Sequence, residues 1–198
     1  MKRWGFTAFF LCLIATLLGG CAAMGNDLPE TEDIQQQYQN LSAFSATADI
    51  TLWAEGQRYD YRLSYQKSAE GESVVVEAPE AIAGLVIPMD GGKVVVSEQG
   101  VLLSPATGYP EGCSPVDCIP KMVELLAGGV PTDIGFSERD DEALVLLEYE
   151  EEVDEGTVLT GISLDGDDGR IRYGSISVNG KERLNCAFAE DISREKGA

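Results

Sequence analysis

The sequence predicts an α+β fold in which two helices cover one face of a strongly curved antiparallel sheet. Apolar and polar residues alternate with period two through much of the chain, as in strands that bury one face. Gly and Pro separate these runs at short intervals, which favours a meander of neighbouring antiparallel strands. Two further segments carry apolar residues at helical spacing, and we expect their apolar faces to pack on the sheet.

Both expected helices are amphipathic. The first covers residues 31–43, where Ile34, Tyr38 and Leu41 recur on one face. The second has Pro120, a residue suited to a first helical turn, and ends at Gly128-Gly129. The apolar stripe of the second helix consists of Ile119, Met122, Val123 and Leu126.

The expected strands follow from short alternating or apolar runs. The best-defined pair is a hairpin of residues 44–54 and 58–65, whose alternating arms are joined by a turn at Glu55-Gly56. Asn179-Gly180 is the strongest two-residue hairpin signal in the chain. The remaining expected elements are strands at 74–76, 85–87, 94–96, 101–103, 143–150, 157–164, 170–178 and 182–188, and a helical turn at 81–84.

Composition limits the function. The chain of 198 residues has 34 acidic and 14 basic residues, so nucleic acid is not an expected partner. Histidine is missing from the sequence, which excludes Ser-His-Asp and Cys-His catalysis and histidine-containing zinc sites. A hydrolase with paired carboxylates is still possible, but no acidic pair stands in a recognisable arrangement. We therefore expect a protein that is not an enzyme and that uses no cofactor.

The N-terminus has the three parts of a secretory signal. A basic start precedes an apolar stretch at residues 4–18, and Gly19 and Gly20 precede Cys21. The Leu-Gly-Gly-Cys run resembles the lipobox of bacterial lipoproteins. That resemblance implies cleavage by signal peptidase II between Gly20 and Cys21, and a diacylglyceryl group, which palmitate would label, on the Cys21 thiol. The alternative is an ordinary secretory signal followed by a chance cysteine.

The chain then divides into four parts. These are a lipoprotein signal peptide at residues 1–20, a lipidated tether at 21–30, a folded domain at 31–192 and a tail at 193–198. Removal of the signal peptide takes two basic residues and no acidic ones, and anionic headgroups repel so acidic a body. The acyl chains therefore have to supply the attachment. The expected location is the extracytoplasmic face of the cell membrane, with the diacylglyceryl anchor as the membrane contact.

Two segments of the domain resemble the LolA/LolB-like lipoprotein-carrier superfamily. One is residues 34–46 (IQQQYQNLSAFSA), a helix that runs into a Phe-x-Ala strand, and the other is residues 76–79 (VEAP) at a strand end. The resemblance covers about residues 30–190 and implies an unclosed half-barrel with a helical lid. Within this superfamily the chain looks most similar to Gram-positive, lipid-anchored GerS-type lipoproteins. Cys21 is a departure from soluble LolA-type shuttles, so an anchored acceptor or scaffold is favoured.

The concave face of a half-barrel is too wide for its own side chains to fill, and an apolar lining there offers acyl chains a dry cleft. The candidate lining residues of the first hairpin are Ile50, Leu52, Tyr59, Tyr61 and Leu63. Those of the lid are Ile119, Met122, Val123 and Leu126. The alternative for each residue is an ordinary core position, because apolar alternation specifies burial and says nothing about a cavity.

Cys113 and Cys118 are separated by four residues in a Pro-rich loop, and outside the cytosol we expect a local disulfide between them. Reduced thiols are the alternative, and a metal site there lacks further nearby ligands. Cys186 alternates with apolar neighbours and is expected to be buried. Residues 165–169 (DGDDG) lack the spacing of an EF-hand calcium loop and are expected to form a tight turn.

These observations favour a membrane-anchored lipoprotein that binds an acyl chain, a lipoprotein or a hydrophobic partner segment in the half-barrel cleft without catalysis. The alternative is a GerS-like scaffold that binds and supports a cell-wall amidase of the germination type. An acidic run at residues 148–155 could face a basic partner surface in that case, although a solvated face is its ordinary role.

Overall fold

The computed structural model describes residues 31–39, 41–91, 93–94, 110, 113–139, 142–189 and 192–196. The predicted signal peptide, the predicted tether with Cys21, and the strand expected at 101–103 lie outside these residues. Of the strand expected at 94–96, only Val94 lies within them.

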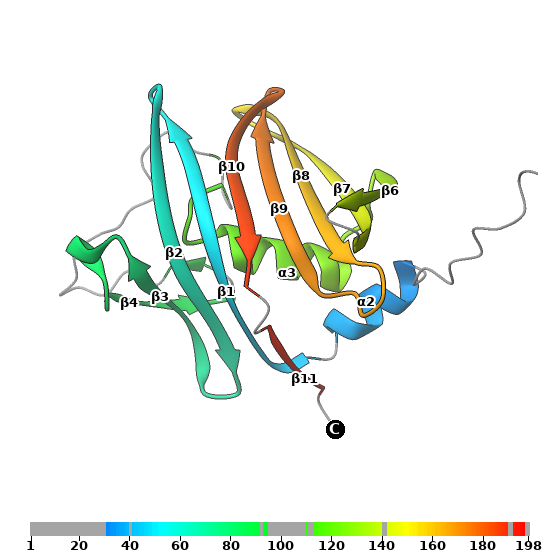
Figure 1. Ribbon diagram of the computed structural model, residues 1–198, viewed down its shortest axis with the longest axis horizontal. Coiled ribbons are helices and arrows are strands. Elements are labelled where there is room, and N and C mark those ends of the chain that lie inside the picture. The colour runs from blue at the N-terminus through cyan, green and yellow to red at the C-terminus, as the bar shows by residue number, and fades with distance from the viewer. Residues whose placement is uncertain are drawn as a thin grey trace, which may run out of the picture.

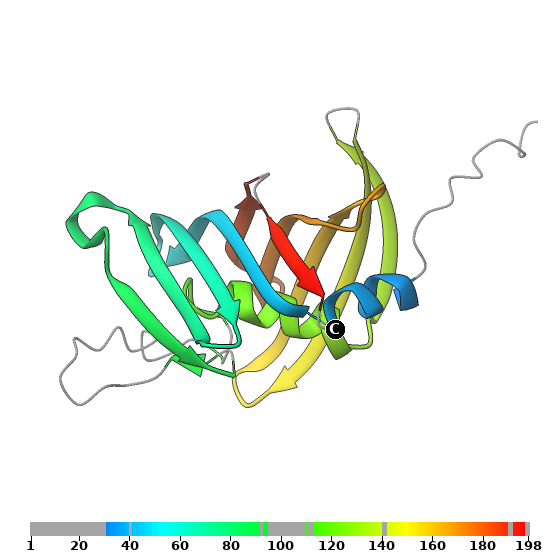
Figure 2. The same ribbon diagram turned by 90° about the horizontal axis from the view of Figure 1, so that it is seen from below.

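Within the described residues, eleven antiparallel strands form one curved sheet whose two ends do not meet. The strand order is β5-β4-β3-β2-β1-β10-β9-β8-β7-β6, and β11 also pairs with β1. Figures 1 and 2 show the sheet bent into a trough. The first half comprises β1 (Leu41–Ala54), β2 (Gln57–Ser68), β3 (Gly71–Ala78), β4 (Val86–Asp90) and β5 (Lys93–Val94). The second half comprises β6 (Asp133–Arg139), β7 (Glu142–Val153), β8 (Gly156–Asp165), β9 (Ile171–Val178), β10 (Lys181–Phe188) and β11 (Ser193–Lys196).

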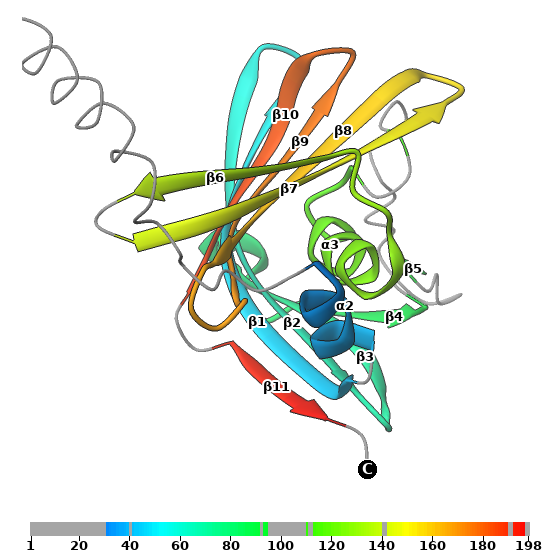
Figure 3. The same cartoon turned by 90° about the vertical axis from the view of Figure 1, so that its right-hand side faces the viewer.

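Two α-helices, α2 (Thr31–Gln39) and α3 (Cys118–Gly128), lie side by side on the concave side of the sheet (Figure 3). A short 3-10 helix, η1 (Glu80–Ile82), connects β3 and β4 where the sequence predicts a helical turn. The predicted α+β class is confirmed, and so is the unclosed, curved antiparallel sheet with a helical cover.

Both predicted two-residue hairpins are confirmed, and all four of their central residues have positive φ. Glu55 and Gly56 have φ values of 52° and 77°, and Asn179 and Gly180 have φ values of 52° and 70°. Positive φ at both central positions matches the twist of the flanking strands, and Asn and Gly adopt it at little cost.

The core lies between the sheet and the two helices. Along β1 every second side chain from Phe44 to Leu52 is buried on this inner face. The rings of Tyr38 and Phe44 lie 6.4 Å apart, and those of Phe44 and Tyr65 lie 6.0 Å apart, so one aromatic row joins α2 to β1 and β2. This row fixes α2 against one end of the trough.

The structure differs from the sequence-based expectation at three elements. The first helix was expected to reach residue 43, but α2 ends at Gln39 and β1 already begins at Leu41. The reason is pairing, since β11 takes residues 41–45 of β1 as its partner. Strand β6 was not expected at all. The segment expected as a tail at 193–198 contains β11, so the C-terminus contributes to the sheet.

Candidate functional site

A cavity of about 290 Å³ lies where α2 and α3 meet one end of the first half of the sheet. It is lined by Tyr38, Gln39, Leu41, Tyr65, Lys67, Glu72, Gly91, Pro120, Val123, Glu124 and Ala127. The volume is close to the lower limit of ligand pockets, which run from ~300 to ~1,000 Å³. Six separate elements or turns contribute to the lining, so the site exists only in the folded domain.

The inner lining of the cavity is aromatic or apolar. Tyr38 and Tyr65 are 3% and 1% exposed, and Pro120 and Val123 of α3 are also buried. Desolvation raises the pKa of Tyr38 to about 12, and its hydroxyl donates a hydrogen bond to the Gly169 carbonyl oxygen at 2.9 Å. Both tyrosines therefore stay neutral at physiological pH and present ring surface to the cavity.

The outer lining is polar. Gln39 and Glu124 are exposed, and the Lys67 ammonium pairs with the Glu72 carboxylate at 2.7 Å. The Glu72 side chain is only 11% exposed, and after desolvation its charge is the next largest cause of the raised pKa of Tyr65. Among the described residues that line the cavity, Lys67 carries the only positive charge, and Glu72 and Glu124 carry the negative charges.

Helix α3 has two different faces. The residues at positions 120, 123, 124 and 127 follow the spacing of one helical face and line the cavity. Cys118 and Met122 lie on another face, are fully buried, and point to the sheet. Gly174 of β9 makes this approach possible, because a Cβ atom there would lie 2.4 Å from the sulfur of Met122.

The predicted cleft residues fall into three groups in the structure. Val123 lines the cavity. Tyr59 and Tyr61 of β2 lie opposite Leu52 and Ile50 of β1 and therefore on the inner face of the sheet. They are less buried than the other predicted residues, and Tyr59 is 40% exposed. The remaining six are buried and do not line this cavity: Ile50, Leu52, Leu63, Ile119, Met122 and Leu126. All of them except Leu52 belong to the main hydrophobic core. The trough is therefore largely occupied by α3, and the space that remains lies beside this helix.

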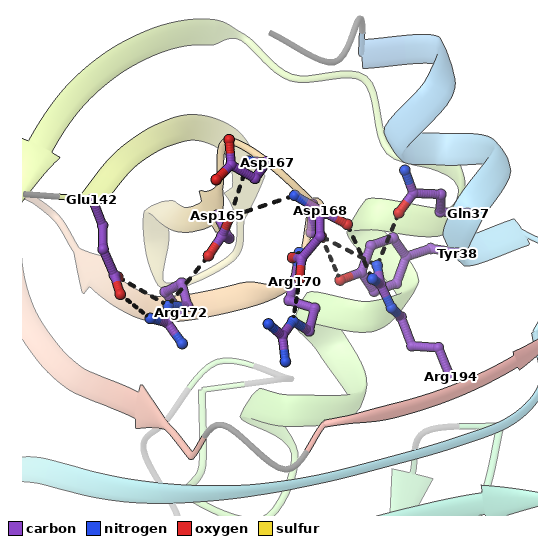
Figure 4. Close-up of polar contacts among 10 residues, drawn as sticks. Gln37, Tyr38, Glu142, Asp165, Asp167, Asp168, Arg170, Arg172 and Arg194 are labelled. Atoms are coloured by element: carbon purple, nitrogen blue, oxygen red, sulfur yellow. Dashed lines mark hydrogen bonds and ion pairs between the residues drawn. The ribbon is translucent and has the colours of Figure 1, made fainter.

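A polar cluster holds α2 at the cavity (Figure 4). Arg194 of β11 donates hydrogen bonds to Gln37 Oε1 at 2.9 Å and to the Asp168 carbonyl oxygen at 3.0 Å, and its guanidinium lies 5.5 Å from the centre of the Tyr38 ring. These contacts connect β11 to α2 and to the β8–β9 turn. They also hold the Tyr38 side chain, which lines the cavity, in place.

The acidic run at residues 165–169 is the tight turn that the sequence predicts. Asp165 accepts a hydrogen bond from the backbone N–H of Asp167 at 2.9 Å. Its neighbour in Figure 4, the Arg172 guanidinium, donates to the Glu142 carboxylate and holds the pKa of that carboxyl below its usual range. In the described part of the chain, no three His, Cys, Asp or Glu residues are grouped so that they could hold a metal ion.

Cys113 and Cys118 are both buried free thiols in the structure, so the disulfide predicted between them stays a prediction. The Cys118 Sγ instead lies 3.6 Å from the Sγ of Cys186. The prediction used only the short spacing in a loop, whereas Cys118 is the first residue of α3 and faces the sheet. The predicted burial of Cys186 is confirmed.

No helix in the ranges that the structure describes is both long and apolar enough to cross a membrane.

The chain is similar in fold to several solved structures, all at low sequence identity. A LolA superfamily protein from Nitrosomonas europaea is 14% identical, with 85% of this chain and 94% of that chain covered and a TM-score of 0.38. The lipoprotein LppX of Mycobacterium tuberculosis is 10% identical, with 83% and 96% covered and a TM-score of 0.42. LprF from Mycobacterium bovis is 12% identical, with 82% and 92% covered and a TM-score of 0.39. No protein-family model and no curated protein matches the sequence. Likeness at this level says nothing about function, which has to be argued from this chain's own residues.

Proposed function

We propose that this protein is a lipid-anchored, non-catalytic binding protein of the bacterial cell envelope. It holds the apolar part of an amphiphile, such as an acyl chain, in the cavity between α2, α3 and the first strands of the sheet. The proposal rests on one observation, that the cavity lining is aromatic and apolar where it is buried and charged at its edge. The Cys21 lipobox supports the anchor and the location outside the cytoplasm.

The size of the cavity sets the affinity that such a ligand can reach. About 290 Å³ corresponds to roughly ten groups of the size of a water molecule, ~30 Å³ each. Ten buried methylenes would contribute roughly 8 kcal/mol at ~0.8 kcal/mol each, before the costs of ordering the ligand are subtracted. The polar head of the amphiphile would remain at the edge, beside the Lys67–Glu72 ion pair.

A fluorescent fatty acid tests the proposal with the mature chain carrying Cys21→Ser. Ala127→Phe fills the cavity from α3, whereas Ala81→Phe adds the same ring to an exposed position on η1. We expect saturable binding to the parent and to the Ala81→Phe protein, and at least tenfold weaker binding to the Ala127→Phe protein. Equal affinities of the two variants would refute this site.

A protein-binding scaffold is the second candidate, and one observation favours it. Edge strand β6 exposes Ile134 and Phe136, which are 43% and 64% exposed, and a sheet edge with apolar side chains suits pairing with another chain. If the scaffold proposal holds, a cell-wall amidase from the same cell co-purifies with this protein, and Phe136→Arg abolishes the complex. Val86→Arg on β4 is the matched control, because Val86 is similarly exposed at 58%.

A further inference from the structure

Sulfur-containing side chains connect the first turn of α3 to the middle of the sheet. Cys118 begins α3, and Met122 follows one turn later on the same face. Met122 packs on Gly174 of β9, and Gly174 is paired in register with Cys186 of β10. This arrangement brings the Sγ atoms of Cys118 and Cys186 within 3.6 Å of each other, although the residues are 68 positions apart in the sequence.

We propose that Cys118 and Cys186 form a disulfide that fastens α3 to the sheet when the protein meets a disulfide oxidant. Two sulfur atoms in a disulfide lie ~2.05 Å apart, so the pair has to close by about 1.6 Å. We expect rotation of the two side chains to supply this displacement, because Cys118 on α3 and Cys186 on β10 already face each other. The proposal goes beyond ligand binding and does not depend on it.

The reaction is an ordinary thiol–disulfide exchange with a small disulfide such as oxidised glutathione. The thiolate of one cysteine attacks the oxidant, forms a mixed disulfide and releases one glutathione thiolate. The second cysteine attacks the mixed disulfide, forms the Cys118–Cys186 bond and releases the second glutathione. Two S–H bonds of the protein are lost, two electrons pass to the oxidant, and the two protons end on the glutathione thiols or in solvent.

Burial controls the rate of this reaction. Cys118 and Cys186 are 0% and 3% exposed, and the Cys118 thiol also lies 3.2 Å from the Pro115 carbonyl oxygen. Desolvation and then the neighbouring Cys186 thiol raise the pKa of Cys118. Since the thiolate is the attacking form, we expect slow oxidation that requires α3 to lift from the sheet. Once formed, the bond closes a long loop, and we expect it to raise the melting temperature by an amount on the order of 10 °C.

Peptide mapping of the full chain, purified from membranes and equilibrated in a glutathione redox buffer, tests the proposal. Trypsin releases residues 94–121, which contain both Cys113 and Cys118, and residues 184–194, which contain Cys186. The expected result is a cross-link between these two peptides under non-reducing conditions. It persists in Cys113→Ala and disappears in Cys118→Ala and in Cys186→Ala.

Two results would overturn the proposal. One is a disulfide confined to the peptide of residues 94–121, which would join Cys113 to Cys118. The other is a chain that stays fully reduced in the oxidising buffer while its melting temperature equals that of the reduced protein. Circular dichroism shows whether each variant is folded. The proposal requires that both Cys118→Ala and Cys186→Ala lose the cross-link, so misfolding of one variant does not decide the test.

Discussion

Placing a methyl group at Gly174 tests whether α3 lies directly on the sheet. A Cβ atom at this position would lie 2.4 Å from both the sulfur and the terminal methyl carbon of Met122. Favourable contacts between such atoms lie at ~3.5–4.0 Å, and Met122 is fully buried, so its side chain has to displace its neighbours. Overpacking of this kind costs about 1–3 kcal/mol, and we expect Gly174→Ala to lower the free energy of unfolding by that amount.

The effect of Gly174→Ala on the free energy of unfolding should change sign when Met122 has already been replaced by Ala. Met122→Ala alone costs about 2–5 kcal/mol, because it removes a fully buried side chain. In that background the obstructing atoms are gone and the nearest remaining contact is the Cβ of Cys186 at an ordinary 3.7 Å. Gly174→Ala then mainly restricts the unfolded chain and should stabilise the protein by about 0.4–1 kcal/mol. The expected coupling energy is therefore roughly 1.4–4 kcal/mol, the sum of these two ranges.

Equilibrium unfolding of the four proteins in urea, followed by far-UV circular dichroism and by Trp53 fluorescence, measures this coupling. The two signals have to give the same midpoint for each protein, which establishes that the transitions are comparable. A coupling energy below about 0.5 kcal/mol would contradict the close contact between α3 and β9.

Four further predictions follow from single contacts. Arg194→Ala removes hydrogen bonds to α2 and to the β8–β9 turn and should lower the free energy of unfolding in urea by about 1–3 kcal/mol. Arg194→Lys should restore little of this loss, because lysine lacks the planar guanidinium group that makes these hydrogen bonds. The buried hydroxyl of Tyr149 finds no hydrogen-bond partner among the described residues, so Tyr149→Phe should raise the free energy of unfolding by about 1 kcal/mol; a loss would mean that the hydroxyl is satisfied. Burial raises the pKa of both Tyr38 and Tyr149 to about 12, whereas tyrosine in the unfolded chain titrates near pH ~10. The free energy of unfolding should therefore be independent of these groups below pH ~10 and should fall as the pH rises from ~10 to ~12. A flat profile in that range would contradict the burial of the two hydroxyls. Cys21→Ser should abolish palmitate labelling and move the protein from the membrane to the soluble fraction of a cell lysate, whereas unchanged labelling would refute the lipid anchor.

The elements with one buried and one exposed face could be predicted from the sequence. Strands β1 and β2 alternate in polarity because their inner side chains pack under the helices, and their turn carries Gly at a position that needs positive φ. Strand β6 could not be found this way. Almost all of its residues are exposed, so no alternation marks them, and only pairing with β7 makes the segment a strand. The same holds for β11, whose sequence SREK is polar throughout.

The cavity could be predicted only in part. Polarity patterns identify which side chains are buried, and six of the nine proposed cleft residues are indeed buried without lining the cavity. They do not reveal where packing leaves space. The lining of the cavity depends on how α2 and α3 meet the ends of three strands, and Tyr38, Tyr65 and Val123 have the same sequence signal as fully packed residues. Lys67 and Glu72 are paired across β2 and β3, a contact that appears only once the register of the two strands is known.

Native mass spectrometry of the protein extracted from its own membranes tests the central claim most directly. The account predicts one acyl amphiphile bound per chain in the wild type and in Ala81→Phe, and its loss in Ala127→Phe. A wild-type chain that carries no ligand and cannot be loaded with a fatty acid would contradict the claim, as would equal retention of the ligand by both variants.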